Sequence, residues 1–144
     1  MNIFLLIGSF FTAMNITFQP ERAGIILYRD NQYLLVQNRN TSKWSFTKGH
    51  SEPFDVNLLE TATREVKEES GYLESEHYTI RAGPYEYGRS MYWYGEVYTT
   101  APHPTLKKDE HFGIGWFTRP EIQLLRTNKD IRVWLKNETR TTKQ

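Results

Sequence analysis

The stretch Arg64-Glu65-Val66-Lys67-Glu68-Glu69-Ser70-Gly71-Tyr72 carries the strongest signal in the chain. On a helix, Glu65, Glu68 and Glu69 stand at positions i, i+3 and i+4, so their carboxylates share one face. Like charges at this spacing repel by about 0.2–0.5 kcal/mol for each pair. A solvated helix face is the ordinary explanation for such a run. The alternative is a bound Mg²⁺ or Mn²⁺, since both ions prefer carboxylate oxygens.

The residues around this stretch predict the helix that carries it. Asn57 is an N-cap residue with Glu60 at the third helical position, and Gly71 suits the position just after the helix end. An apolar stripe recurs every fourth residue, at Leu58, Ala62 and Val66. We therefore expect an amphipathic helix that ends before Gly71.

The segment before the helix also contains charged residues. Lys48-Gly49-His50 predicts a tight glycine turn after a short strand, and Glu52 and Asp55 follow in the loop. Acidic residues in both the loop and the helix are not expected of a merely solvated helix face. They suit a site that binds metal-bound phosphates. This context favours a metal site over the solvated face.

Apolar and β-branched runs elsewhere predict a sheet. Strands are expected at residues 23–28, 32–37, 44–47, 78–80, 90–98 and 114–117. Asp30-Asn31 should close a hairpin between the first two strands. A second helix should open at Thr118-Arg-Pro-Glu121 and run to Leu125, with a further turn or two over residues 130–136. Strands that alternate irregularly with helices predict an α+β sandwich.

The composition is that of one globular domain, which we expect to cover residues 14–144. Apolar residues make up 38% and charged residues 24% of the chain, which excludes a largely disordered protein. The formal net charge of +1 does not indicate a strongly basic nucleic-acid binder. The absence of cysteine excludes disulfides, cysteine-ligated zinc and a thiol nucleophile.

Residues 1–13 form an apolar N-terminal extension. They resemble the apolar part of a signal peptide without its positively charged start, and they are too short to span a bilayer. Three interpretations of this segment are open: it is a signal or anchor, it lies upstream of an alternative start codon, or it adds a strand to the domain. We expect a cytoplasmic protein with no membrane partner, unless this segment directs secretion or anchoring.

Residues 49–72 resemble the Nudix box, written G-x5-E-x7-R-E-U-x-E-E-x-G-U with U a bulky apolar residue. The matching positions are Gly49, Arg64, Glu65, Val66, Glu68, Glu69, Gly71 and Tyr72. The resemblance covers about one sixth of the chain. It implies a Nudix-type α/β/α sandwich with a central mixed sheet and a strand–loop–helix catalytic motif.

The chain departs from this pattern at two points. Asp55 replaces the first glutamate, and Arg64 lies fifteen positions after Gly49 where the pattern has fourteen. In the family the first acid supports the box arginine. Here either Asp55 or Glu60 could support Arg64, and the sequence does not decide between them.

The resemblance implies hydrolysis of a phosphoanhydride in a nucleoside diphosphate linked to another group. Water attacks phosphorus, and Mg²⁺ or Mn²⁺ lowers the pKa of that water. By resemblance, Glu65, Glu68 and Glu69 bind metal, and Glu65 or a later glutamate takes the proton. The backbone carbonyl of Lys48 completes the metal shell, and Arg64 braces the carboxylates.

Further segments resemble the diadenosine tetraphosphate hydrolases of this family. They are Trp44-Ser-Phe-Thr-Lys-Gly-His50 with Glu52-Pro53, Tyr92-Trp-Tyr-Gly-Glu-Val97, and Glu110-His-Phe-Gly-Ile-Gly-Trp116. The resemblance implies that Lys48, Gly49 and His50 lie near the phosphates. It also implies that Tyr92 contacts substrate and that Glu110 joins the metal shell or acts as base. Structural roles for His50 and His111 remain open alternatives.

The predicted function is metal-dependent hydrolysis of dinucleoside polyphosphates such as diadenosine tetraphosphate. One alternative is removal of the mRNA cap, because residues 119–144 carry a formal charge of +4 that could hold RNA. Hydrolysis of diphosphoinositol polyphosphates is another, and a non-catalytic nucleotide-binding module is a third. The expected partner is a small nucleotide, with RNA as a partner only of a decapping enzyme. The oligomeric state is not set by the sequence.

Overall fold

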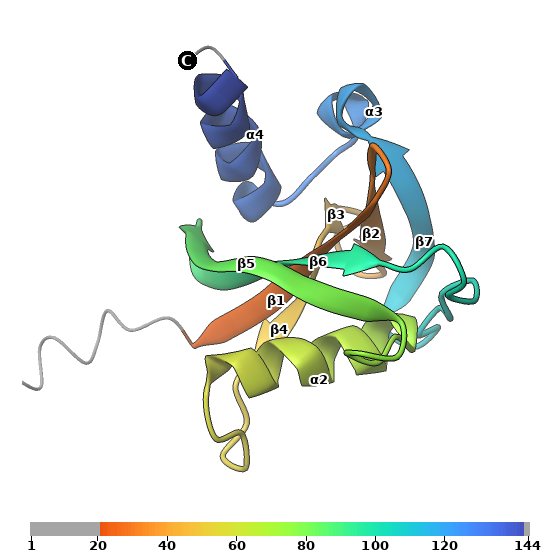
Figure 1. Ribbon diagram of the computed structural model, residues 1–144. Helices are drawn as coiled ribbons and strands as arrows, with labels where there is room; N and C mark the ends of the chain where they lie inside the picture. The colour runs from red at the N-terminus through yellow and green to blue at the C-terminus, as the bar shows by residue number, and fades with distance from the viewer. Residues whose placement is uncertain (1–20, 143–144) are drawn as a thin grey trace, which may run out of the picture.

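The computed structural model of the protein describes residues 21–142, so the expectations for residues 1–13 and for a start at Met14 fall outside the described residues. Its elements, in chain order, are β1 (Arg22–Arg29), β2 (Gln32–Asn38), β3 (Trp44–Ser45), β4 (Thr47–His50), α2 (Leu58–Ser70), β5 (Tyr78–Tyr87), β6 (Ser90–Val97), β7 (His111–Thr118), α3 (Arg119–Leu124) and α4 (Lys129–Thr142). Figure 1 shows their arrangement.

Within the described residues, the strands form one seven-stranded mixed sheet. Its main path runs β3-β2-β1-β6-β5, with β4 beside β1 and β7 beside β2. β1 and β6 run parallel, whereas the other pairs are antiparallel. The expected hairpin forms between β1 and β2, with Asp30 at a positive φ of 55° in its turn. The sheet is therefore the mixed one that the family resemblance implies.

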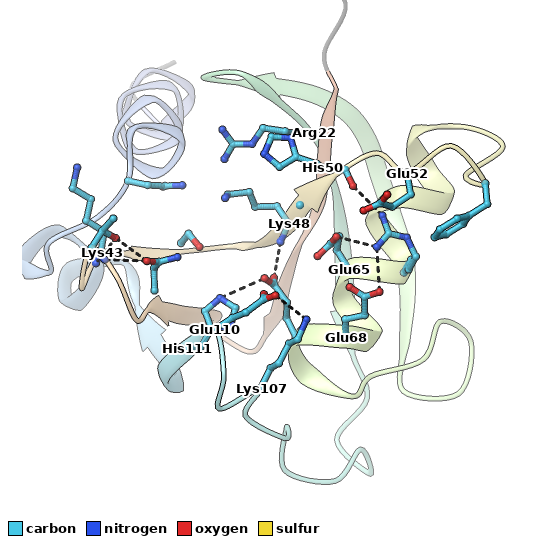
Figure 2. Close-up of a pocket in the computed structure, with 18 residues that line it drawn as sticks. Arg22, Lys43, Lys48, His50, Glu52, Glu65, Glu68, Lys107, Glu110 and His111 are labelled. Atoms are coloured by element: carbon cyan, nitrogen blue, oxygen red, sulfur yellow. Dashed lines mark hydrogen bonds and ion pairs between the residues drawn. The ribbon is translucent and has the colours of Figure 1, made fainter.

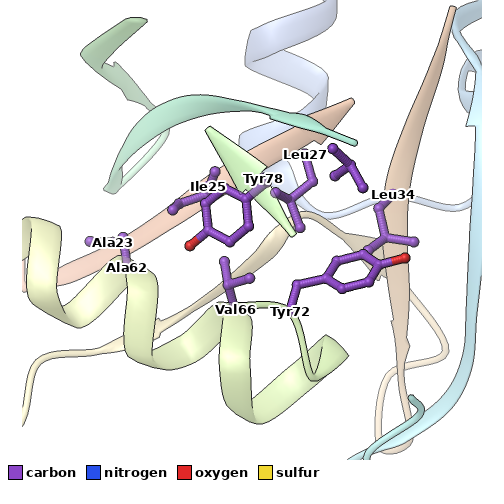
Figure 3. Close-up of a cluster of buried hydrophobic side chains, with 9 residues drawn as sticks. Ala23, Ile25, Leu27, Leu34, Ala62, Val66, Tyr72 and Tyr78 are labelled. Carbon is purple, nitrogen blue, oxygen red and sulfur yellow. The ribbon is translucent and has the colours of Figure 1, made fainter. Parts of the chain in front are cut away.

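Helices cover both faces of the sheet, which confirms the α+β sandwich (Figure 1). On one face, α2 packs on β1 through buried residues that include Ala62, Val66 and Ile25 (Figure 3). On the other face, α3 and α4 contribute Ile122 and Trp134 to a second core. Burial of such side chains is the main stabilising term of a domain this size.

Helix α2 begins and ends where the sequence predicts. The Asn57 side chain accepts a hydrogen bond from the Glu60 N–H at 2.9 Å, which satisfies one free donor of the first turn. Gly71 has a φ of 80°, a left-handed conformation that favours glycine, and its N–H donates to the Lys67 carbonyl. Because Ala62 and Val66 of this helix are buried against β1, the rotation of its acidic face about the helix axis is fixed.

The expected glycine turn at Lys48-Gly49-His50 is wrong, because these residues form strand β4. β1 pairs with β2 only near the hairpin, at Tyr28↔Tyr33 and Arg29↔Gln32. The first half of β1 pairs with β4 instead, from Arg22↔His50 to Ile25↔Thr47. The backbone groups that β2 leaves unpaired on β1 are thus satisfied by β4, a requirement that local turn signals do not reveal.

None of the helices in residues 21–142 combines the length and the apolar character that crossing a membrane would require.

Candidate active site

A cavity of about 810 Å³ lies where β4, α2 and the loop before β7 meet (Figure 2). Its volume is in the range of small-molecule sites. Of the residues predicted for the site, it is lined by Lys48, Gly49, His50, Arg64, Glu65, Glu68, Glu69 and Glu110. Residues that the sequence places in separate segments therefore share one hollow.

The contact between β4 and α2 is so close that any side chain at position 49 would displace the Glu65 carboxyl group. A Cβ atom on Gly49 would overlap the carboxyl group of Glu65. The glycine therefore lets the strand pass directly over this carboxylate, which turns into the cavity. This close approach, rather than a turn, is the structural reason for glycine here.

Asp55 supports Arg64, which resolves the alternative left by the sequence. The Arg64 guanidinium donates to both Asp55 oxygens, at 3.1 Å from Nε and 2.9 Å from Nη2. The hydrogen bonds from Arg64 hold the pKa of the Asp55 carboxyl at about 2. Glu60 does not contact this guanidinium and instead accepts from the Val56 N–H at 3.2 Å.

Arg64 in turn holds two glutamates of the acidic face. Its Nη1 donates to Glu65 at 3.0 Å and to Glu68 at 3.1 Å, and its Nη2 donates to the His50 carbonyl at 2.9 Å. One arginine thus joins the loop, the helix and the end of β4. This bracing role matches the one that the sequence suggests for it.

Glu69 is the most buried of the three glutamates, with only 5% of its surface exposed. Its Oε1 accepts from the Lys48 backbone N–H at 2.9 Å. Burial raises the pKa of Glu69 to about 8 despite that hydrogen bond. Burial also raises the pKa of Glu65, and burial beside Arg22 lowers the pKa of the Lys48 amine. Such perturbed groups gathered in one cleft are typical of catalytic sites.

The loop before β7 brings two more ligand-type side chains to Glu69. One ligand atom each from Glu69, Glu110 and His111 lie within 4.8 Å of one another. His111 Nε2 is 3.4 Å from Glu69 Oε2, and burial lowers the pKa of His111. Glu110 is half-exposed and pairs with Lys107 at 3.0 Å.

Arg39, which sequence reasoning missed, anchors this loop. Its Nη2 and Nε donate to the Lys108 carbonyl at 2.7 and 3.0 Å, and its backbone N–H donates to the Glu110 carbonyl at 2.9 Å. The guanidinium also lies 4.6 Å from the centre of the Phe112 ring. Because Arg39 lies far from this loop in the sequence, no local sequence pattern predicts the contact.

The wall opposite the acidic helix is basic. Arg22, Lys43, Lys48 and His50 line the cavity, and Figure 2 shows Arg22, Lys48 and His50 across from the carboxylates. The Arg22 Nε is buried and has no hydrogen-bond partner among the described residues. Arg22 and Lys43 were also missed, since a lone basic residue at a strand edge or in a loop carries no signal of its own.

Tyr92 lies away from the cavity that its family resemblance assigns it to. Its side chain is fully buried in the core under α4, and its hydroxyl donates to Asp130 at 2.6 Å. The alternation along β6 does turn Tyr92 away from Trp93, but α4 covers the face that it reaches. In this structure Tyr92 therefore has no exposed surface for a substrate.

Comparison with known proteins places this geometry in context. The NUDIX domain model matches residues 19–137. Protein 111R of Invertebrate iridescent virus 3 is 39% identical over 54 residues. That match covers 38% of this chain and 31% of the viral protein, so the chain's match spans about a third of that relative.

Solved structures share the fold at low sequence identity. A C. elegans Ap4A hydrolase, in a binary complex, is 22% identical with a TM-score of 0.70, over 84% of this chain and 97% of that one. A NUDIX hydrolase from Nitrosomonas europaea is also 22% identical, with a TM-score of 0.60 over 84% of this chain and 90% of that one. These similarities concern the fold.

Proposed function

The chain belongs to the NUDIX domain family, and we propose that it hydrolyses phosphoanhydrides with a divalent cation, acting on dinucleoside polyphosphates such as diadenosine tetraphosphate. The observation that carries the proposal is a single cavity with carboxylates on one wall and basic side chains on the other. Such a cavity can hold a cation and a chain of phosphates at the same time.

The side chains present suit a divalent cation. Glu65 and Glu69 are carboxylates whose burial disfavours the charged form, and Glu110 adds a third beside them. Buried carboxylates are commonly compensated by pairing or by metal coordination. Glu65, Glu68, Glu69, Glu110 and the Lys48 carbonyl would hold Mg²⁺ or Mn²⁺, which lowers the pKa of a bound water and neutralises phosphate oxygens.

The remaining chemistry needs a proton acceptor. Glu69 and Glu65 both have pKa values raised by burial, so each is a stronger base than a surface glutamate. Glu110 reaches the same space from the opposite loop. We assign the acceptor to this group of three. No side-chain nucleophile is required, in keeping with a chain without cysteine.

The basic wall supports a substrate with several phosphates. Arg22, Lys43, Lys48 and His50 would each face an anionic oxygen along an extended phosphate chain. Arg22 has a buried Nε without a partner among residues 21–142, and a phosphate oxygen is a fitting acceptor for it. A dense basic pocket for a diphosphoinositol polyphosphate is less well supported, because the same cavity contains Glu52 and the α2 glutamates.

The test is a comparison of substrates under defined metal conditions. The protein is incubated with diadenosine tetraphosphate, capped RNA and a diphosphoinositol polyphosphate, each with Mn²⁺, with Mg²⁺ and with EDTA. We expect metal-dependent, asymmetric cleavage of the dinucleotide that exceeds turnover of the other two. Preferential release of the cap would favour the decapping alternative, whereas binding without turnover would favour a nucleotide-binding module.

Two variants on α2 distinguish a loss of catalysis from a general effect on the helix. Glu69→Gln should lower turnover at least ~100-fold, because it removes a buried carboxylate of the site. Glu60→Gln is the matched control, since Glu60 lies outside the cavity and its bond from Val56 can be accepted by an amide oxygen. Equal rates for the two variants would refute the role assigned to Glu69.

A further inference from the structure

We propose that His111 is a direct nitrogen ligand of the divalent cation, together with Glu69 and Glu110, and that this set selects Mn²⁺ and similar transition-metal ions over Mg²⁺. The proposal rests on the metal-dependent hydrolysis proposed above. It adds an imidazole to the carboxylate and carbonyl ligands that the box implies.

The geometry brings three ligand types to one point. Ligand atoms of Glu69, Glu110 and His111 all lie within 4.8 Å of one another. Three atoms each about 2.0–2.2 Å from a common ion are separated by roughly 3–4 Å, so small side-chain movements would suffice to close the site. Glu69 comes from α2 and the other two come from the loop and first residue of β7. The cation would therefore join two elements distant in sequence.

The His111 imidazole lacks the well-formed hydrogen bonds that a structural role would require. Its residue is 4% exposed, yet its Nδ1 is buried without a hydrogen-bond partner among the described residues. Nε2 approaches Glu69 Oε2 at 3.4 Å, which is longer than an ordinary N–H···O hydrogen bond. A buried imidazole kept only for structure would be expected to donate a well-formed hydrogen bond. A metal ion bound by Nε2 and by the Glu69 carboxylate would replace this long contact with two ligand bonds.

The two other glutamates of the acidic face, Glu65 and Glu68, each have an arginine partner. Arg64 donates to Glu65 and to Glu68 at 3.0 and 3.1 Å. Among the ion pairs in the described part of the chain, Glu69 has contact only with His111. The place where a cation relieves most electrostatic strain is thus the end of α2 that faces His111.

The ligand chemistry sets the expected selectivity. Mg²⁺ is a hard ion that takes oxygen ligands and keeps several waters, whereas imidazole suits first-row transition metals. Replacing one oxygen by nitrogen therefore favours Mn²⁺ more than Mg²⁺. We expect the wild-type protein to bind Mn²⁺ in preference to Mg²⁺ without any substrate present.

The decisive measurement is pulsed electron paramagnetic resonance of Mn²⁺ bound to the substrate-free, full chain. A directly bound imidazole gives ¹⁴N modulation of the Mn²⁺ signal. Protein labelled with ¹⁵N-histidine should show that modulation replaced by the ¹⁵N pattern. This labelling reports on the unmodified protein, so it remains informative even where a variant fails to fold.

Three variants identify the histidine. His111→Ala should abolish the modulation, lower Mn²⁺ affinity at least ~10-fold and reduce the Mn²⁺ over Mg²⁺ preference. His50→Ala removes the other imidazole that lines the cavity and should leave the modulation intact. His103→Ala, at an exposed position outside the cavity, is the matched surface control.

The outcomes separate this proposal from the proposed function. Bound Mn²⁺ without histidine modulation, or modulation that survives His111→Ala, overturns the ligand assignment and leaves metal-dependent hydrolysis standing. Hydrolysis at full rate in EDTA overturns the proposed function instead. Failure of the substrate-free wild-type protein to bind Mn²⁺ also overturns the ligand assignment, whereas the proposed function is judged by turnover with and without EDTA.

Discussion

Replacement of Asp55 by asparagine tests how the loop and helix of the site are held together. The Asp55 carboxylate is 2% exposed and accepts both bonds of the Arg64 fork. It also accepts from the Glu52 N–H at 2.8 Å and from the Thr61 hydroxyl at 2.9 Å. Asparagine keeps the shape, removes the charge and replaces one of the two accepting oxygens with a donor, so it weakens these charge-assisted contacts.

The magnitude follows from the carboxyl's depressed pKa. A fall from 3.8 to about 2, at about 1.4 kcal/mol for each pKa unit, corresponds to about 2.5 kcal/mol of stability at neutral pH. Because the folded pKa of Asp55 lies below the unfolded one, this stability is present above pH 4 and is lost as pH falls toward 2. We expect Asp55→Asn to lower the unfolding free energy by about 2 kcal/mol at pH 7, with the difference from wild type narrowing below pH 4.

Urea denaturation followed by tryptophan fluorescence, repeated between pH 7 and pH 3, measures this difference. Glu60→Gln is the control, and it should change the unfolding free energy by less than ~0.5 kcal/mol, because Glu60 is exposed and only caps the Val56 N–H. A difference between Asp55→Asn and wild type that stays constant with pH would refute the electrostatic argument. A larger loss for Glu60→Gln would refute the assignment of Asp55 as the support of Arg64.

Three further variants probe other contacts of the site. Gly49→Ala should displace the Glu65 carboxylate and lower kcat/KM about 100-fold in a steady-state assay, with the fold retained by circular dichroism. Tyr92→Phe should lower the unfolding free energy by about 1–3 kcal/mol, because it removes the 2.6 Å hydrogen bond to buried Asp130 and leaves the longer one from the Arg89 N–H at 3.4 Å, while KM stays unchanged. Arg39→Ala should release the loop before β7 and weaken Mn²⁺ binding about 10-fold, as measured by titration calorimetry. Arg39→Lys should restore little of the lost Mn²⁺ affinity, because the lysine ammonium lacks the guanidinium fork.

The parts of the site that the sequence predicts are those encoded locally. Helix α2 is recognisable because its Asn57 cap, its Gly71 end and its apolar stripe all lie within one segment. The spacing of Glu65 and Glu69 on that helix then follows from helix geometry alone. Their convergence on one cavity is what the structure adds.

The parts that escape prediction depend on contacts between distant segments. The strand character of Lys48-Gly49-His50 depends on β1 having unpaired backbone where β2 diverges. The choice between Asp55 and Glu60 depends on which loop conformation brings a carboxylate to Arg64. Two acids of similar spacing look equivalent until the loop is folded.

The acidic face of α2 is compensated unevenly, and this asymmetry determines where the site can act. Along the helix, Arg64 forms ion pairs with the carboxylates of Glu65 and Glu68, and it also pairs with Asp55 of the preceding loop. Glu69 has the Lys48 backbone N–H and the His111 imidazole beside it, but no lysine or arginine side chain within ion-pair distance among the described residues. A cation entering the cavity therefore gains most beside Glu69, which is also the end nearest the Lys48 strand and the basic wall. Under the proposed function, phosphate oxygens held by that wall would lie next to a cation bound at Glu69.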